Sequence, residues 1–390
     1  MNTEKTIFAQ LLSFIPKYEF DKCVTRYNGN YRVRTFTCWE QFIVMCFAQL
    51  TYRDSLRDIE TCLRAMQTKL YHIGLRSKIS KSTIADANES RDWRIFADFC
   101  HYLIGWAEKL YHDDAGFTVE LKNAVYAIDS TTINLCLSLF PWAKFRKHKG
   151  AIKLHTQLNL KTLLPKEIEI TDGLCHDVNI LDLIMFELNS IYVLDRGYVD
   201  FKRLYSIHAA NAYFVTRAKK NLRFKRIIST AVDKTTGVRC DQVIKLAGNI
   251  ASKDYPDRLR RIKYYDGENR RNFVYLTNHF ELAPEIIAKL YKNRWKIELF
   301  FKWIKQHLKI KAFYGTSINA VFTQIWIAIS AYVLVAIVKK LLNLDQSLYT
   351  ILQIISVSLF EKIPLNQVFL KSNYSFSDPE IDKQLILFDL

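Results

Sequence analysis

The chain has few of the residues that build zinc sites, disulfide frameworks and flexible linkers. Its 390 residues include only 8 cysteines, 11 glycines and 7 prolines. The cysteines are scattered, with no C-x-x-C pair and no close Cys/His group, which argues against a zinc site and suits a reducing compartment. Internal repeats and low-complexity tracts are absent, and the N-terminus leads into an amphipathic segment. We therefore expect a globular cytoplasmic protein without a signal peptide.

Positive charge is in clear excess. The chain carries 56 Lys plus Arg against 39 Asp plus Glu, a formal net charge of +17. Hydrophobic residues make up 49% and charged residues 24%, values typical of a folded protein rather than a disordered one. Such an excess predicts a polyanionic partner, and nucleic acid is the usual one.

The first part of the chain, residues 1–115, is predicted to be mostly helical. Glycine is scarce there, and apolar residues recur at three- and four-residue spacing. Residues 76–88 predict a short turn followed by a helix capped by Ser80 or Ser82. Five residues here are predicted to be exposed, and their types can reach phosphates and base edges: Lys81, Ser82, Thr83, Asn88 and Arg91. A helix-turn-helix and an ordinary capped helix both remain open.

One apolar stretch, residues 321–338, is long enough to cross a membrane. Polar side chains interrupt it at Thr323, Gln324 and Ser330, and it stands alone in a basic chain. We therefore expect a buried core helix and no membrane partner. A further helical stretch is predicted from residue 346 to about 360.

The pattern becomes α/β after a small polar linker at 112–116. Short β-prone runs predict four strands, at 124–128, 151–160, 167–170 and 190–194. Residues 178–188 predict a helix. The first and last strands each run into an aspartate, Asp129 and Asp195, and turn-forming residues follow. We expect each aspartate to end a buried strand at the rim of a sheet.

Residues 201–285 predict a mainly β insertion with basic connections. Its four strand-like runs lie at 213–216, 242–246, 262–265 and 273–276. Basic residues form two clusters, the first of Arg217, Lys219, Lys220, Arg223, Lys225 and Arg226, the second of Arg258, Arg260, Arg261, Lys263, Arg270 and Arg271. Either cluster alone is compatible with a solvated face. Two in one segment predict a surface that follows phosphates.

Residues 291–308 contain no Gly or Pro and predict one helix. At about 100° per residue, one strip about 60° wide carries Tyr291, Arg294, Glu298 and Lys305. A second stripe, predicted to be buried, carries Leu290, Ile297, Phe300, Ile304 and Leu308. A solvated face with ion pairs would give the same pattern. The carboxylates earlier in the chain favour a functional face.

Asp129, Asp195 and Glu298 are the candidate catalytic residues. If the strands before Asp129 and Asp195 are neighbours, their carboxylates lie side by side, which is costly unless a cation joins them. Mg²⁺ or Mn²⁺, hard ions that prefer oxygen ligands, would suit such a set. Three carboxylates could hold two ions, which promote in-line phosphoryl displacement.

These residues resemble the DDE transposases of bacterial insertion sequences. The ordered set Asp129, Asp195 and Glu298 is similar to their three acids. The spacing Tyr-x-x-Arg-x-x-x-Glu-x-x-x-x-x-x-Lys, at Tyr291, Arg294, Glu298 and Lys305, resembles the signature of the IS-four family. The resemblance covers about residues 120–345.

The resemblance implies an α/β fold with a ribonuclease-H-like mixed sheet flanked by helices, interrupted by the β insertion and preceded by an α-helical domain. The implied division is a DNA-end-binding domain at 1–115, a catalytic domain at 120–200 and 286–345, the insertion at 201–285 and a helical C-terminal segment at 346–390. It further implies a bacterial, nucleoid-associated enzyme that uses two Mg²⁺ or Mn²⁺ ions held by the three acids.

The implied partners are double-stranded DNA, as terminal inverted repeats and as target, and a second copy in a synaptic homodimer. The expected DNA-binding residues are Tyr291, Arg294, Lys305, Trp295, Arg217, Lys219, Lys220 and Arg223. Relatives that cleave through a hairpin hold a flipped base against a Trp of the insertion, yet no Trp lies between Asp195 and Trp295.

Three functions remain to be separated: a cut-and-paste transposase, a DNA-binding protein of transposase descent that does not cut, and an indiscriminate metal nuclease. Binding alone does not need three acids. Indiscriminate cleavage needs neither the large basic insertion nor the N-terminal helices.

Overall fold

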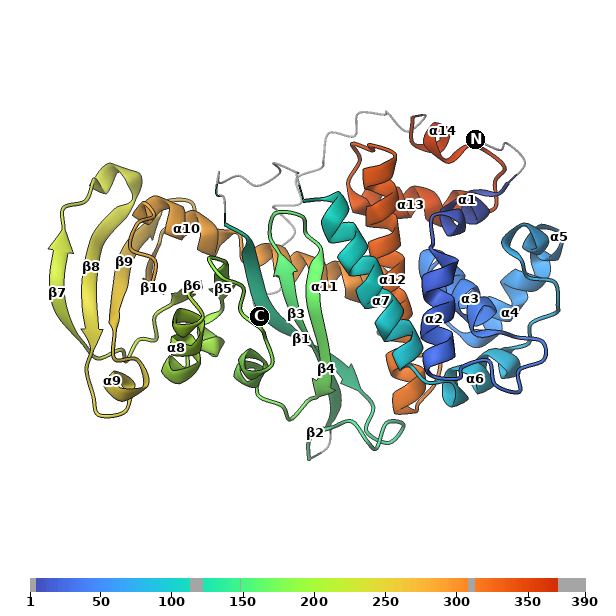
Figure 1. The fold of residues 1–390 in the computed structure, drawn as a ribbon, viewed down its shortest axis with the longest axis horizontal. Helices are drawn as coiled ribbons and strands as arrows, with labels where there is room; N and C mark the ends of the chain where they lie inside the picture. Colours follow the sequence, from blue (N-terminus) through green and yellow to red (C-terminus); the bar gives the residue numbers. More distant parts are fainter. Residues whose placement is uncertain (1–4, 113–120, 122, 148, 308–312, 371–390) are drawn as a thin grey trace.

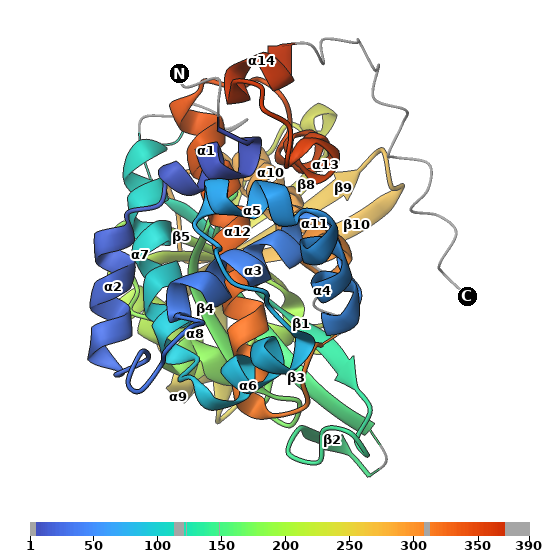
Figure 2. The ribbon, with the colours of Figure 1, turned by 90° about the vertical axis from the view of Figure 1, so that its right-hand side faces the viewer.

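The computed structural model describes residues 5–112, 121, 123–147, 149–307 and 313–370. The molecule is elongated, with a sheet at one end and in the middle and a bundle of helices at the other end (Figure 1). Helices from the N-terminal and C-terminal parts of the chain lie together in this bundle (Figure 2).

The N-terminal part is helical, as predicted. Its elements are α1 (Ile7–Ser13), α2 (Lys17–Arg26), α3 (Cys38–Leu50), α4 (Leu56–Ala65), α5 (Gln67–Leu70), the 3₁₀ turn η1 (Tyr71–Ile73), α6 (Lys81–Ser90) and α7 (Arg94–Leu110). Side-chain caps mark several starts; Thr37 and Glu40 form a reciprocal capping box at α3. Ser80 caps α6, where its Oγ accepts a hydrogen bond from the backbone N–H of Thr83 at 3.2 Å.

In the described residues the sheet has ten strands: β1 (Val125–Leu135), β2 (Lys144–Arg146), β3 (Lys149–Asn159), β4 (Pro165–Asp172), β5 (Ile191–Leu194), β6 (Tyr213–Arg217), β7 (Phe224–Thr230), β8 (Val238–Leu246), β9 (Arg258–Asp266) and β10 (Arg271–Thr277). Their order is β2-β3-β1-β5-β6-β10-β9-β8-β7, with β4 paired to β3. Only the β1–β5 and β5–β6 pairs are parallel among those described. The sheet is therefore mixed, open and mostly antiparallel.

The region between β5 and β10 is continuous with the central sheet. Helix α8 (Phe201–Ala209) connects the parallel strands β5 and β6, and β10 pairs with β6. The prediction of strand-like runs from residue 201 onward thus omitted α8, and it also omitted β7. Short helical elements complete this part: η3 (Arg196–Tyr198), η4 (Lys234–Thr236) and α9 (Ala251–Asp254). The division of the chain into domains stays a prediction.

The predicted helix at 178–188 is wrong in its second half. A 3₁₀ helix, η2 (Asp177–Asp182), is followed by a non-helical segment up to β5. In that segment Leu183 and Met185 are exposed, whereas Ile184 and Phe186 are partly buried. The apolar residues thus alternate with period two, as in extended chain, and do not form the single stripe of a helix.

The C-terminal part contains α10 (Pro284–Lys292), α11 (Trp295–His307), α12 (Ile318–Leu341), α13 (Leu348–Ser358) and α14 (Leu365–Leu370). Helix α12 passes between the N-terminal helices and contacts α3, α6 and α7 (Figure 2). It is long and apolar enough to span a membrane, but 94% of its most apolar window is buried inside the protein. Its burial agrees with the predicted core helix.

Two hydrophobic clusters hold the sheet between them. The larger cluster joins the N-terminal helices, α11 and α12 to one side of the sheet. The smaller one packs α8 and the η2 region against the other side, around Ile128, Tyr192 and Leu194. Since residues alternate along β1, Asp129 points to the side opposite Ile128, which is the side covered by α11.

Candidate active site

Asp129 and Asp195 lie next to each other at the point where the parallel pairing of β1 with β5 ends. Ile128 of β1 is in register with Leu194 of β5, and each aspartate is the next residue. One part of the prediction is wrong, however, because Asp129 does not end its strand. β1 continues to Leu135, since its antiparallel partner β3 pairs along the whole length. Asp129 therefore sits where the parallel pairing stops and the antiparallel pairing goes on.

The two carboxylates have different environments. Asp129 Oδ1 accepts from the backbone N–H of Ser130 at 2.8 Å, and burial raises the pKa of Asp129 to about 6 against the opposing effect of Arg294. Asp195 Oδ2 accepts from the N–H of Gly197 at 3.2 Å. Burial raises the pKa of Asp195, but backbone N–H groups of Gly197 and Arg196 outweigh this effect and lower it overall.

The predicted single helix at 291–308 is divided into two. α10 ends at Lys292 and α11 begins at Trp295. At the junction the backbone bonds tighten to three-residue spacing, since the N–H of Arg294 donates to the carbonyl of Tyr291 at 3.1 Å. The side-chain amide of Asn293 also donates a hydrogen bond to the carbonyl of Lys289, in the last turn of α10, at 2.9 Å.

Despite the break, the residues of the predicted functional face still point toward β1 and Asp195. Tyr291 OH donates to Asp195 Oδ1 at 3.3 Å, and Lys305 Nζ donates to the carbonyl of Thr132 on β1 at 2.8 Å. The buried stripe is confirmed at Leu290, Ile297, Phe300 and Ile304. Leu308 lies outside the described residues.

Arg294 lies between two of the three acids. Its Nη1 donates to Asp129 Oδ2 at 2.7 Å, and its Nη2 forms an ion pair with Glu298 Oε1. The side chains of Arg294 and Asp129 are 14% and 19% exposed, whereas that of Glu298 is 57% exposed. Burial disfavours the guanidinium charge, yet the attraction of Asp129 raises the pKa of Arg294. Arg294 thus provides the positive charge that these carboxylates require.

The three acids do not form a ready metal cage. Within the described part of the chain, no group of three His, Cys, Asp or Glu side chains is arranged to hold a metal ion. The donor chemistry nevertheless suits a hard divalent cation, because Asp129 and Asp195 are neighbours in the strand register and Arg294 bonds both Asp129 and Glu298. An ion would replace Arg294 as the partner of Asp129, so binding requires the guanidinium to move.

Of the predicted DNA-binding residues outside the signature, Arg217 lies near Asp195 and four others are exposed on the surface. Arg217 follows Thr216, which pairs with Leu194, so it stands at the same sheet edge as Asp195. Its guanidinium lies 4.9 Å from the Phe273 ring centre. Four other candidates are exposed: Trp295 (42%), Lys219, Lys220 and Arg223. The Lys219 ammonium also donates to the carbonyl of Val199 at 2.8 Å.

Not every basic residue of the insertion can reach DNA. Arg260 is buried, pairs with Asp241 at 2.7 Å and donates to the carbonyl of His279 at 3.2 Å. Its role is therefore structural, because withdrawing a buried guanidinium from its partners would be costly. The basic surface of the second cluster rests on its exposed members Arg258, Arg270 and Arg271.

One residue beside the acids was missed from sequence. Thr156 of β3 is the cross-strand partner of Asp129 and is 1% exposed. Cross-strand partners on one face approach closely, so Thr156 limits the space around the Asp129 carboxylate. Alternation along residues 151–160 could have indicated its face, but the register to β1 could not be read from sequence.

Of the residues around α6 that were predicted to contact DNA, some are exposed and others are buried. Lys81 and Ser82 are exposed at the start of α6. Asn88 and Arg91 are buried instead, because Asn88 Oδ1 accepts from Gln41 Nε2 at 2.8 Å and Arg91 donates to the carbonyl of Thr37 at 2.9 Å. Both residues hold α6 against α3 and the loop before it, so their predicted exposure is wrong.

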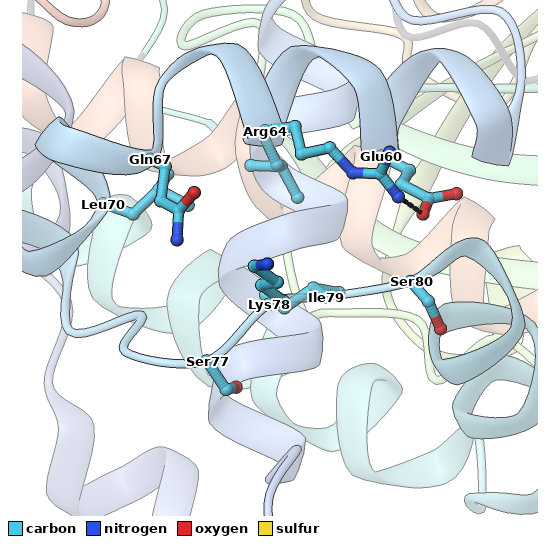
Figure 3. A pocket seen from close by; sticks show the side chains of 9 residues that line it. Glu60, Arg64, Gln67, Leu70, Ser77, Lys78, Ile79 and Ser80 are labelled. Carbon is cyan, nitrogen blue, oxygen red and sulfur yellow. Dashed lines mark hydrogen bonds and ion pairs between the residues drawn. The ribbon is translucent and has the colours of Figure 1, made fainter.

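A cavity of about 240 Å³ lies between α4, α5 and the segment that leads into α6 (Figure 3). Lys78 and Ser80 line it from that segment, and Arg64, which pairs with Glu60 at 2.6 Å, lines it from α4. Seven residues, 74–80, separate η1 from α6. This connection is longer than the short turn of a typical helix-turn-helix.

The fold and the site thus define a basic α/β protein with a carboxylate-rich sheet edge. Two family models match the chain: a transposase DDE domain at residues 120–334 and a domain of unknown function, DUF4372, at residues 3–76. The first covers more than half of the chain and contains all three acids.

Three relatives are described as insertion-sequence or related transposases. A protein described as transposase y4zB of Sinorhizobium fredii is 33% identical over 285 residues, which are 72% of this chain and 77% of the relative. The transposase of insertion sequence element IS5377 from Geobacillus stearothermophilus is 30% identical over 53% of this chain and 54% of its own length. That of element IS4SA from Synechocystis is 26% identical over 72% and 77%. This chain belongs to the DDE transposase family, and membership implies DNA binding and an endonuclease or transferase activity.

Proposed function

We propose that this chain is a cut-and-paste transposase of the IS-four family. It binds the terminal inverted repeats of its own element, cleaves at their ends and joins them to target DNA. Two contacts support the proposal: Asp195 lies beside Asp129 in the strand register, and Arg294 bonds both Asp129 and Glu298. Binding alone needs no such set of acids.

The strand order supports a ribonuclease-H-like core. Along the sheet, β4, β3, β1, β5 and β6 are consecutive, with antiparallel pairing up to β1 and parallel pairing after it. In this proposal residues 120–200 and 286–345 form the catalytic domain, residues 201–285 the insertion, and residues 346–390 a helical C-terminal segment. Residues 1–115 bind the DNA ends.

Each member of the signature has a proposed role. Tyr291 and Arg294 hold backbone phosphates near the cleaved bond, Arg294 with two hydrogen bonds of its planar fork. Lys305 acts as a point charge that places the transferred end. Arg294 changes partner on DNA binding, from the carboxylate of Asp129 to a phosphate. Exposed Trp295, Lys219, Lys220 and Arg223, with Arg217, extend the DNA contact beyond the site.

Asp129, Asp195 and Glu298 would hold two Mg²⁺ or Mn²⁺ ions once Arg294 has moved. Such ions activate a water or 3′-hydroxyl and stabilise the leaving oxygen. The chain itself orients the scissile phosphate between β1, β5 and α11. We further propose a homodimer that holds both ends, acting at the bacterial nucleoid in the cytoplasm.

A second candidate is a transposase-derived DNA-binding protein that does not cut. The Arg294 contacts favour it, since they occupy Asp129 and Glu298 in the structure. A labelled duplex carrying the inverted repeats that bracket the gene separates the candidates. With Mg²⁺, cleavage at the ends and joining support the transposase, specific binding without cleavage supports the second candidate, and degradation of any duplex refutes both.

A further inference from the structure

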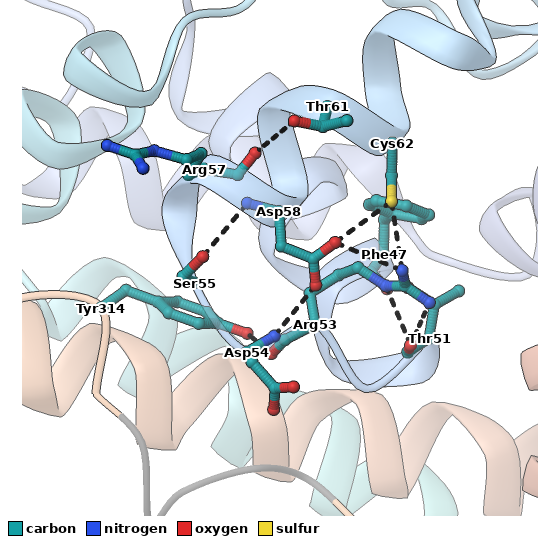
Figure 4. Close-up of polar contacts among 10 residues, drawn as sticks. All are labelled: Phe47, Thr51, Arg53, Asp54, Ser55, Arg57, Asp58, Thr61, Cys62 and Tyr314. Carbon is teal, nitrogen blue, oxygen red and sulfur yellow. Dashed lines mark hydrogen bonds and ion pairs between the residues drawn. The ribbon is translucent and has the colours of Figure 1, made fainter.

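Residues 313–319, which we term the joint segment, connect three separate parts of the protein. The segment follows α11 in sequence and ends in the first turn of α12, which begins at Ile318. Tyr314 contacts the first part, the α3–α4 loop, where its hydroxyl donates to the carbonyl of Arg53 at 2.6 Å (Figure 4). The backbone N–H of Tyr314 donates to Gln324 Oε1 of α12 at 2.9 Å.

The Arg53 loop is itself tightly bonded to α4. Arg53 donates through Nη2 to the carbonyl of Thr51 at 2.7 Å and through Nη1 to Cys62 Sγ at 3.1 Å (Figure 4). Asp58 closes the group, accepting from Arg53 at 3.4 Å and from the Cys62 thiol at 3.3 Å. A displacement of Tyr314 is therefore passed to α4, which packs on α6.

Asn319 contacts the second part, the junction between α6 and α7. Its Nδ2 donates to the carbonyls of Asn88 at 2.8 Å and Arg91 at 2.5 Å, and its Oδ1 accepts from the N–H of Trp93 at 3.1 Å. Next to it, the Ser317 hydroxyl donates to Glu89 Oε2 at 2.7 Å. All four contacts join residues distant in sequence, so they connect the start of α12 to the end of α6.

The third part is the loop that follows β1. Trp142 Nε1 donates to the carbonyl of Thr316 at 2.7 Å, and the rings of Phe140 and Phe313 lie 6.1 Å apart. The same strand carries Asp129, and its Thr132 carbonyl accepts from Lys305 of α11. The joint segment thus connects the N-terminal helices to the loop after β1, the strand of Asp129, and it follows the helix of Glu298 in sequence.

We propose that the joint segment couples DNA occupancy of α4 and α6 to the alignment of Glu298 and Lys305 with Asp129. Tyr314 and Asn319 are positioning residues in this coupling, because their described hydrogen bonds join parts of the protein and reach none of the three acids. The inference rests on the proposed function, in which the N-terminal helices bind the ends. It explains how cleavage is confined to an end that these helices have recognised.

The test compares Tyr314→Phe with a matched control, Tyr111→Phe. Tyr111 OH also donates to a backbone carbonyl, that of Ala336 at 2.8 Å, but it joins α7 to α12 outside the joint segment. Each change removes one hydroxyl and keeps the ring. For each full-length protein, the dissociation constant for the inverted-repeat duplex and the single-turnover cleavage rate at saturating protein are measured, with thermal melting as a check of folding.

Tyr314→Phe is expected to bind the repeat duplex as the wild type does and to cleave it about five- to tenfold more slowly, since one hydrogen bond is lost from the aligned state. The stimulation, defined as the ratio of the cleavage rates with and without the repeat in the duplex, is therefore expected to fall in Tyr314→Phe. Asn319→Ala, which loses three bonds, lowers the stimulation further if its melting shows a folded protein.

An unchanged stimulation in Tyr314→Phe, or an equal fall in Tyr111→Phe, overturns the coupling while the proposed function stands. Absence of cleavage by the wild type on every duplex overturns the proposed function itself, and the inference with it.

Discussion

Removing Arg294 should weaken the protein without metal and strengthen its response to metal. Arg294→Ala leaves the Asp129 carboxylate, 19% exposed, without the cation that now lies 2.7 Å away. Removing one partner of a fully buried ion pair lowers the unfolding free energy by about 3–5 kcal/mol. Because this pair is partly exposed, we expect a loss at the lower end of that range. We therefore expect the variant to lose about 3 kcal/mol of unfolding free energy in chelator.

A divalent ion should then take the place of the guanidinium. In the wild type an ion must displace Arg294 from Asp129 and Glu298, whereas in the variant both carboxylates are already available. A Mn²⁺ concentration of about a hundred times its dissociation constant would restore about 2.7 kcal/mol of unfolding free energy. The assay is a thermal melt of the DNA-free protein across a Mn²⁺ titration, and we expect a larger shift at lower concentration in Arg294→Ala.

Arg203→Ala is the matched control. Arg203 bonds Asp182 and Asp200 at 2.7 and 3.2 Å, away from the three acids. This variant should lose stability without gaining sensitivity to Mn²⁺. Equal Mn²⁺ shifts in the wild type and Arg294→Ala would refute the reasoning that the guanidinium occupies the cation position.

Three further outcomes are expected. Glu298→Gln should abolish end cleavage and leave end binding within about twofold, since one ligand is lost but no DNA contact; retained cleavage in a gel assay removes Glu298 from the site. Lys220→Ala should reduce the slope of log affinity against log salt by about one, because one phosphate contact is lost; an unchanged slope excludes Lys220 from the DNA contact. Burial lowers the pKa of His155 to about 4, below its unfolded value of 6.5, so His155 takes up a proton on unfolding between these values. The wild type should therefore lose up to about 3 kcal/mol more than His155→Gln as the pH falls from 6.5 to 4 in denaturant titrations, and parallel curves would contradict this.

Local patterns predicted much of the fold because they reflect local physics. The period of apolar residues identified the N-terminal helices, the buried helix α12 and most strands of the sheet. It failed at residues 183–188, where apolar residues alternate along an extended chain and three of the five are exposed. It also could not show that the helix around Arg294 breaks, because only Asn293 and Arg294 separate α10 from α11, and no Gly or Pro marks the break.

The candidate site was predictable in its members and not in its contacts. The spacing from Tyr291 to Lys305 placed four side chains on one face, and that face does meet β1 and β5. The pairing of Arg294 with Asp129 depends on how α11 is seated on β1, a tertiary relation that spans 165 residues of sequence. Burial of Asn88 and Arg91 depends likewise on packing against α3.

The most direct test of the account is a change of metal preference at Asp129. A thiolate is a softer ligand than a carboxylate, so Asp129→Cys should fail with Mg²⁺ and recover cleavage of the inverted-repeat duplex with Mn²⁺. Such recovery is the predicted result, because it requires residue 129 to touch the ion. Full cleavage by Asp129→Cys in Mg²⁺, with no gain from Mn²⁺, would contradict the claim that these three acids hold the cations that cut DNA.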